Sequence, residues 1–560
     1  MAETHRNRRR KPKDDFLMQG AILAIAGVIT KIIGVVYRIP LTNILGDEGN
    51  GFYGYAFEVY ATALILSSLS LPTAVSKLVS ARMAMRQRRN AFRVFVCSLF
   101  FSLITGAVFA LIIFFGADGI STHLMESPLS AYALKVLAPG LFIVSLLGVL
   151  RGYFQGLGTM VPTAVSQVIE QIINAAVSLI GASILFGIGV KAAESKKIDL
   201  LGPAYGAAGG TLGTVAGALF ALIFLLFSFW AYRGTIRRQI RSDHTRRQES
   251  YGRLLKILLL TIVPVIFSTA IYNINQILDM TIFNKIMAAQ GLAEEEYMAL
   301  LGIYTGKYNT LINVPMAMAN GLAASVIPSL TAAVAVNNRQ QIHDKINQSV
   351  RFTMLIAIPC FVGFVVLASP LMVLLYNDSS RTPAMLLATG AVTLVFYCWA
   401  TVSNSILQGL DKISSPAKNA GISLVIHIAA LLIMLVVFKW NIYALVGSNI
   451  VFALCMCVLN VRDIQKASGY RLEIGKTFIR PLIAAGIMGV VTYAVHLVMD
   501  LVIGGRFAAT AISILFAVVV YGVSVLKLGT LSDRDIMDLP QGRKILRLCR
   551  RFHLLPRSEE

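Results

Sequence analysis

The sequence is poor in charge and especially poor in acidic residues. Only 14% of its 560 residues are charged, and 28 Asp and Glu stand against 50 Lys and Arg. This low fraction excludes an ordinary soluble domain, in which about a quarter of the residues are charged. Cysteine is also scarce, and the six cysteines lack the paired spacing of metal ligands. We therefore expect buried packing thiols, and neither a zinc site nor a disulfide framework.

Long apolar runs take the place of charge. Apolar residues make up 56% of the chain, and the mean hydropathy is +0.71. Runs of about 20 residues, long enough to cross a bilayer as helices, recur from residue 17 to residue 527. They do not alternate as barrel strands would. The fold class predicted is an all-α polytopic membrane protein with about fourteen transmembrane helices, at 17–45, 52–80, 92–116, 130–153, 160–188, 203–231, 257–285, 300–335, 350–376, 383–408, 416–438, 441–461, 478–503 and 507–527.

The charges between the spans predict the orientation. Basic loops alternate with acidic ones, and short loops rich in Lys and Arg stay in the cytoplasm. We therefore expect a multi-pass protein of the bacterial plasma membrane with both termini cytoplasmic. The net charge of +22 is spread over successive loops. This spread favours contact with anionic membrane lipids and argues against a nucleic-acid partner.

An internal repeat divides the chain. The segment from Leu150 to Leu157, followed by Pro162, reappears as Ser403 to Leu410, followed by Pro416. Six spans separate the copies, so both halves have the same orientation and are predicted to enclose a central cavity. The predicted divisions are a basic N-terminus (1–16), an N-lobe (17–231), a basic loop (232–256), a C-lobe (257–461), an appended helix pair (478–527) and a basic tail (528–560) with the pattern of an amphipathic helix.

Two cations interrupt the first span. Lys31 and Arg38 are seven residues apart, and therefore share one face of a helix about 10 Å apart. A cation inside the membrane costs about 2.5–3.5 kcal/mol on insertion scales, so the pair suggests a wet cavity that receives an anion. The alternative is an internal ion pair with Glu58 on the second span.

Four segments of the sequence carry a family resemblance: Lys31 to Gly46, Pro72 to Val79, Arg151 to Gly156, and Pro162 to Gln167. They resemble the MurJ, SpoVB and YtgP group of the multidrug, oligosaccharidyl-lipid and polysaccharide exporter superfamily. The resemblance implies fourteen helices in two lobes and outward flipping of a lipid-linked peptidoglycan precursor by alternating access. It also implies a cationic cavity for the lipid diphosphate, to which Lys31 and Lys307 would contribute. Tyr37 stands where the group has a second arginine, and Arg38 follows it.

Three further cations are candidates for binding the substrate. Lys307 lies near the outer end of the eighth span, from which it could also extend toward the headgroups. Lys77 lies near the inner end of the second span, where the same alternative holds. Arg151 lies where the fourth span leaves the bilayer, and it could guide a headgroup or anchor the helix.

Polar residues inside two other spans suggest a second role. Gln276 and Asp279 belong to a ridge on the seventh span, and Asp279 could bind Na⁺ or a proton. Glu170 and Asn174 belong to a stripe on the fifth span that hydrogen bonding between helices would also explain. No cofactor is expected beyond a coupling ion, Na⁺ or H⁺, or the membrane potential.

Three function classes follow. The first is a flippase for an undecaprenyl-diphosphate-linked saccharide, with lipid II or another polysaccharide intermediate as cargo and the cell-wall synthesis machinery as a partner. The second is a cation-coupled multidrug antiporter, which would want an acidic or aromatic cavity. The third is a membrane enzyme, for which we find no phosphate-binding loop, metal motif or nucleophile elbow.

Overall fold

The structure is a computed structural model that describes residues 12–243, 245, 248–503, 506–531, 537, 546, 547 and 550. The predicted amphipathic tail therefore falls largely outside the described residues. Among the described residues every regular element is helical, which confirms the all-α membrane fold class. The long helices are α1 (Pro12–Ser67), α2 (Leu71–Ala84), α3 (Arg88–Gly119), α4 (Ala131–Gly156), α5 (Val161–Lys196), α6 (Leu201–Arg241), α7 (Tyr251–Ala289), α9 (Asn309–Ala335), α10 (Arg339–Val366), α13 (Val392–Gly409), α14 (Ser414–Leu432), α15 (Tyr443–Ser468), α16 (Arg480–Ile503) and α17 (Arg506–Lys527).

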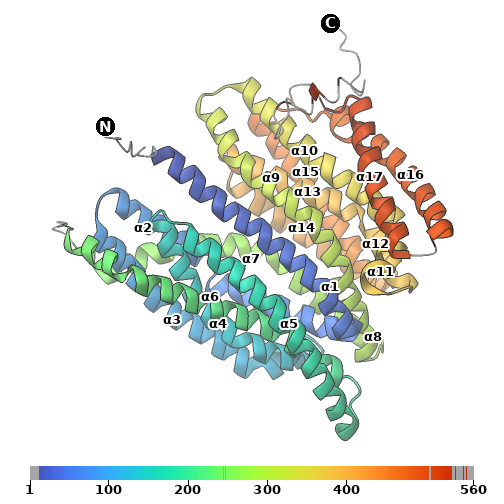
Figure 1. Cartoon of the computed structure of the whole chain (residues 1–560), viewed down its shortest axis with the longest axis horizontal. Helices are drawn as coiled ribbons and strands as arrows, with labels where there is room; N and C mark the ends of the chain where they lie inside the picture. Colours follow the sequence, from blue (N-terminus) through green and yellow to red (C-terminus); the bar gives the residue numbers. More distant parts are fainter. Residues whose placement is uncertain are drawn as a thin grey trace, which may run out of the picture. The chain divides into compact units, whose positions relative to one another are not determined.

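The chain forms two compact units, residues 1–302 and 303–560. The first contains α1 to α7 and the short α8 (Glu294–Gly302). The second begins with a π-helical turn, η3 (Ile303–Tyr308), and adds the short α11 (Ala368–Tyr376) and α12 (Arg381–Gly390) to its long helices. Figure 1 shows the long helices of each unit running alongside one another, for example α3 beside α4 and α16 beside α17.

Twelve segments of the described residues are long and apolar enough to cross a membrane. One of them, Ile25–Ala84, has 60 residues and would extend roughly 90 Å as a straight helix, three times the hydrocarbon thickness. It is broken at Gly46, whose φ of 69° and ψ of −177° lie outside the helical region. Twelve is therefore not a count of crossings, and the number of about fourteen stays a prediction.

The connection between α6 and α7 is shorter than the basic loop expected at 232–256, since both helices extend into that range. It is clamped to the corner between α2 and α3. Arg82, whose side chain is only 6% exposed, forms an ion pair with Glu249. The Asp243 carboxylate accepts hydrogen bonds from the Arg89 amide at 2.6 Å and the Thr245 amide at 2.8 Å.

The repeat seen in the sequence has a counterpart in the backbone. Helix α4 ends at Gly156 and α13 ends at Gly409, 253 residues later. At the same offset, Gly158 (φ 86°) and Asp411 (φ 61°) both adopt the left-handed conformation. The backbone hydrogen bonds of the two turns also match: Leu157 to Tyr153, Gly158 to Gln155 and Thr159 to Phe154 in the first, and Leu410 to Ile406, Asp411 to Gln408 and Lys412 to Leu407 in the second.

The final helix pair packs on the outside of the second unit, as expected for appended helices. Helix α16 contacts α10, and α17 contacts α11. Tyr521 donates a hydrogen bond to the Leu355 carbonyl at 3.0 Å, and Trp399 packs its ring on Phe478 with centroids 4.8 Å apart. Many apolar side chains of the pair remain exposed, among them Leu501 at 86%. A lipid environment accounts for such surfaces.

Candidate functional site in the first unit

The break at Gly46 turns α1 back on itself. In a continuous helix, Arg38 and Tyr53 would be roughly 22 Å apart along the axis. Instead, the Arg38 guanidinium carbon lies 4.2 Å from the centre of the Tyr53 ring. Asn50 supports the bend by donating hydrogen bonds to the carbonyls of Thr42 at 2.9 Å and Gly46 at 2.6 Å. A residue with a Cβ rarely adopts this φ, so glycine is required here.

Tyr53 gives Arg38 an aromatic platform. The Tyr53 ring is buried and stacks on Phe57, with centroids 5.9 Å apart and planes 6° apart. A guanidinium over such a ring gains roughly 0.5–2 kcal/mol and keeps its N–H groups free to point elsewhere. Among the described residues, Nη1 of Arg38 is shielded from solvent and has no hydrogen-bond partner. This arrangement fixes a cation whose hydrogen-bonding capacity is not used up by the protein.

The two cations of the first span are unequal. Lys31 is exposed, whereas Arg38 is half-buried. Glu58 is half-buried on the second arm of α1, and no ion pair joins it to Lys31 or Arg38 within the described part of the chain. The internal pair considered as an alternative is thus not formed in this structure.

Helix α5 presents its polar stripe to α1. Asn174 donates a hydrogen bond to the Tyr37 hydroxyl at 3.2 Å, next to Arg38 in the chain. One turn earlier on α1, a Cβ built at Gly34 would lie 3.1 Å from the Gln171 amide nitrogen. The amide side chains therefore border the face of α1 that carries Arg38. We define the Arg38 cluster as Arg38, Tyr37, Tyr53 and Asn174.

Arg151 is held within the same lobe. Its guanidinium contacts the Glu170 carboxylate at 2.6 Å and donates to the Ser166 hydroxyl at 3.0 Å. Glu170 is therefore engaged as an ion-pair partner. Lys77 is exposed on α2, with no ion pair in the described residues. The structure thus brings Arg151 and Glu170 together as an ion pair that does not include Lys77.

Lys307 lies in the second unit, in the π-helical turn η3. Its ammonium group is buried, 8% exposed, and lies 2.6 Å from the Asp378 carboxylate. Burial acts to raise the pKa of Asp378, but hydrogen bonds from Lys307 and Ser380 dominate and hold this pKa below its usual value. π-Helical turns often mark functional positions, since they widen the helix locally. In this structure the Lys307 ammonium is engaged by Asp378, and its role in binding the substrate stays a prediction.

The polar residues predicted to form a ridge on α7 differ in their exposure to solvent. Gln276 is exposed, whereas Asp279 is only 1% exposed. Within the described residues, no group of three or more His, Cys, Asp or Glu side chains could hold a metal ion. A role of Asp279 in binding Na⁺ or a proton therefore stays a prediction.

Two contact partners, Tyr53 of Arg38 and Asp378 of Lys307, are not predicted from the sequence. Tyr53 lies 15 residues from Arg38, a spacing that places the two far apart on a straight helix. The useful signal is Gly46 with Asn50 one turn later, which marks a possible bend. Asp378 is a carboxylate in a short loop after α11, and nothing in its spacing points to Lys307.

Two protein-family models with the same description match this sequence. The model described as polysaccharide biosynthesis protein matches residues 16–334, and a second model with the same description matches residues 293–382. The first match covers more than half of the chain and contains the Arg38 cluster.

Individual relatives agree with this match. Stage V sporulation protein B of Bacillus subtilis (strain 168) is 26% identical over 410 residues, 73% of this chain and 75% of that protein. Lipid II flippase MurJ of the same organism is 26% identical over 434 residues, 75% of this chain and 76% of that protein. A solved structure of lipid II flippase MurJ in an inward closed conformation aligns with a TM-score of 0.64 at 15% identity, over 90% of this chain and 98% of that one. This structural similarity supports the assignment of the fold and nothing further.

Proposed function

Because the chain belongs to the polysaccharide biosynthesis protein family, in its MurJ- and SpoVB-like branch, we propose that it moves a lipid-linked saccharide across the membrane. The cargo proposed is lipid II, carried on undecaprenyl diphosphate from the inner to the outer leaflet by alternating access. The proposed setting is the bacterial plasma membrane, with cytoplasmic termini. The relatives reported above with a printed activity are flippases, not enzymes.

The observation that carries the proposal is the Arg38 cluster. A guanidinium binds phosphate oxygens through charge-assisted, often bidentate hydrogen bonds. Arg38 is backed by the Tyr53 ring and has a shielded nitrogen without a partner in the described residues. Such a cation in a membrane helix is costly unless an anion compensates it. A lipid diphosphate supplies that anion and keeps its hydrocarbon chain in the bilayer.

Two other functions are alternatives to lipid II flipping. Another undecaprenyl-linked polysaccharide intermediate would use the same cation, because it carries the same diphosphate. A multidrug antiporter for cationic drugs fits less well. Its substrate would be repelled by Arg38 and Lys31, although the aromatic pair of Tyr53 and Phe57 would suit it.

The test measures outward exposure of lipid II in cells depleted of their own flippase. The parent chain is compared with Lys31→Ala and Arg38→Ala at matched expression and membrane insertion. Lys135→Ala is the control, since this half-buried lysine pairs with exposed Asp118 outside the cluster. We expect the parent and the control to restore exposure. Arg38→Ala is expected to lose about 10- to 100-fold in rate, from charge-assisted bonds worth about 1.5–3 kcal/mol.

The outcomes separate cargo from site. Full activity of the folded Lys31→Ala and Arg38→Ala variants would reject Arg38 and Lys31 as the phosphate site while leaving the flippase in place. An inserted parent that fails to restore lipid II exposure would reject lipid II as the cargo. Repeating the assay with another undecaprenyl-linked glycan would then decide between the remaining rivals.

A further inference from the structure

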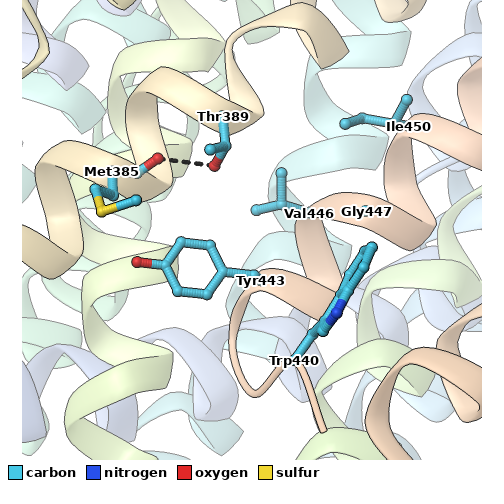
Figure 2. Close-up of a pocket in the computed structure, with 7 residues that line it drawn as sticks. All are labelled: Met385, Thr389, Trp440, Tyr443, Val446, Gly447 and Ile450. Atoms are coloured by element: carbon cyan, nitrogen blue, oxygen red, sulfur yellow. Dashed lines mark hydrogen bonds between the residues drawn. The ribbon is translucent and has the colours of Figure 1, made fainter. Parts of the chain in front are cut away.

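A pocket of about 430 Å³ lies between α12 and α15 in the second unit. Figure 2 shows Met385 and Thr389 on one side of it and Tyr443, Trp440 and Val446 on the other. The remaining lining residues are Gly447 and Ile450. This volume is in the range of ligand pockets, and the lining is almost wholly apolar. Its few polar atoms include the Thr389 hydroxyl, which donates to the Met385 carbonyl of its own helix at 2.7 Å.

The loop before α15 holds Trp440 in place. The two residues that flank it, Lys439 and Asn441, both have a φ of 52°. This left-handed conformation is uncommon without glycine and needs support from its surroundings. The Trp440 amide donates to the Met434 carbonyl at 3.0 Å, and the indole stacks on Phe438 with centroids 5.6 Å apart. The indole is thus a fixed wall of the pocket.

One exposed cation contacts this apolar pocket, and a second lies next to its Trp440 wall in the chain. Arg381, the first residue of α12, contacts the wall directly, with its Nε atom 3.1 Å from the Met385 sulfur. Lys439 precedes Trp440 in the chain, and both cations are exposed. No ion pair engages either one in the part of the chain that the structure describes, and the neighbouring Asp378 is already bound to Lys307.

We propose that this pocket binds an anionic phospholipid, with an acyl chain against Trp440 and Met385 and the phosphate between Arg381 and Lys439. Aromatic side chains such as Trp440 and Tyr443 are typical of the headgroup level of a bilayer, where a phosphate meets its chains. A zwitterionic lipid offers the same chain but brings a second, positive charge to the two cations. The occupant is therefore selected by charge, and the site is separate from the Arg38 cluster.

The test uses Trp440 as the reporter. The chain has three tryptophans, so Trp230→Phe with Trp399→Phe leaves Trp440 alone. This full-length protein is placed in vesicles that contain brominated phosphatidylglycerol or brominated phosphatidylcholine with the same chains. Bromine quenches tryptophan on contact, so the ratio of quenching gives the relative affinity. We expect phosphatidylglycerol to be favoured by about tenfold, the size of one charge-assisted contact.

Three variants in the Trp440-only background locate the effect. Arg381→Gln with Lys439→Gln should abolish the preference while the bromines of both lipids still reach the indole. Thr389→Phe, at an exposed position, should fill the pocket and reduce quenching by both lipids. Lys412→Gln removes an exposed cation at the turn between α13 and α14 and should leave the preference unchanged.

Each other outcome overturns the proposal. Equal quenching by the two lipids in the parent would reject selection by charge. A preference that survives Arg381→Gln with Lys439→Gln would place the anion elsewhere. Displacement by a trace of undecaprenyl diphosphate, far below the phospholipid concentration, would replace the phospholipid with a lipid-linked diphosphate as the occupant. None of these readouts depends on flipping, so failure here leaves the proposed function untouched.

Discussion

The two repeated turns share a backbone but differ in the side chains around them. Gly156 ends α4 and packs on Val79 of α2, and Gly409 ends α13 and packs on Leu330 of α9. A Cβ at Gly156 would lie 2.6 Å from the Cβ of Val79, and one at Gly409 would lie 3.0 Å from the Cβ of Leu330. The close helix contact is therefore common to both units.

Charge is where the units diverge. Arg82, three residues after Val79, is buried and paired with Glu249, whereas Ala333, three residues after Leu330, is buried and apolar. At the 253-residue offset, Arg151 corresponds to Asn404, which accepts a hydrogen bond from Asn460 at 2.8 Å. The comparison teaches that small residues at helix contacts preserve the repeated scaffold. Around the repeated turn, the charged pairs of Arg82 and Arg151 are differences superimposed on that scaffold.

The largest effect is expected from removing the partner of Arg82. Glu249→Ala leaves a buried guanidinium unpaired, which typically costs about 3–5 kcal/mol. Thermal unfolding of the purified protein in detergent would measure the loss. Adding Arg82→Ala makes the corner resemble Ala333 of the second unit and should recover most of the stability. A double variant as unstable as Glu249→Ala would show that the pair cannot be treated as an addition to the scaffold.

A smaller effect is expected from a methyl group at the repeated glycines. Gly156→Ala and Gly409→Ala should each cost about 1–3 kcal/mol through overpacking. The first should cost more, because its contact is shorter by 0.4 Å than that of the second, 2.6 Å against 3.0 Å. Melting temperatures of the two variants, measured side by side, test this order. The reverse order would mean that the second turn is the less adaptable one.

A smaller loss of stability is expected from Arg151→Asn, which introduces the residue type found at the corresponding position of the second unit, Asn404. The Arg151 and Glu170 side chains are 15% and 29% exposed, so we expect the loss of stability to be only about 1 kcal/mol. Transport would fall more than stability if Arg151 guides a headgroup. The lipid II exposure assay and a melting curve on the same preparation separate these roles. Unchanged transport would reduce Arg151 to a structural residue.

The smallest effect is a loss of stability at acidic pH, and it concerns Asp243 in the first unit and Asp378 in the second. Burial acts to raise the pKa of Asp243, but hydrogen bonds from Arg89 and Thr245 dominate and lower it, as those from Lys307 and Ser380 do for Asp378. A lowered pKa stabilises the fold above the ordinary value of about 3.9, and this contribution is lost as the pH falls through the folded-state pKa. The contribution of these two carboxylates to the melting temperature should therefore be constant from pH 7 to about 5 and fall below about 4. Asp243→Asn should flatten that fall, and an identical profile would exclude Asp243 as its cause.

Sequence reasoning captured the scaffold better than the site. Apolar runs and the repeated Gln-Gly-Leu segments predict the helices and the matching turns, because hydrophobic length and turn chemistry act locally. Lys31 and Arg38 stand out because charge inside a span is costly. Their different environments do not follow from spacing. The contact of Arg38 with Tyr53 depends on a bend, and the pairing of Lys307 with Asp378 joins segments 71 residues apart.

The single-residue bend at Gly46 also has a consequence for biogenesis. Its two arms are joined without a loop, and Asn50 already satisfies carbonyls on the first arm through hydrogen bonds. Two apolar helices connected so tightly can enter the bilayer together as a hairpin, with their backbone groups satisfied before later spans are synthesised. The Arg38 cation would then meet its Tyr53 platform at the moment of insertion. We expect the N-terminal hairpin to set the orientation of the growing chain before the rest of the lobe exists to support it.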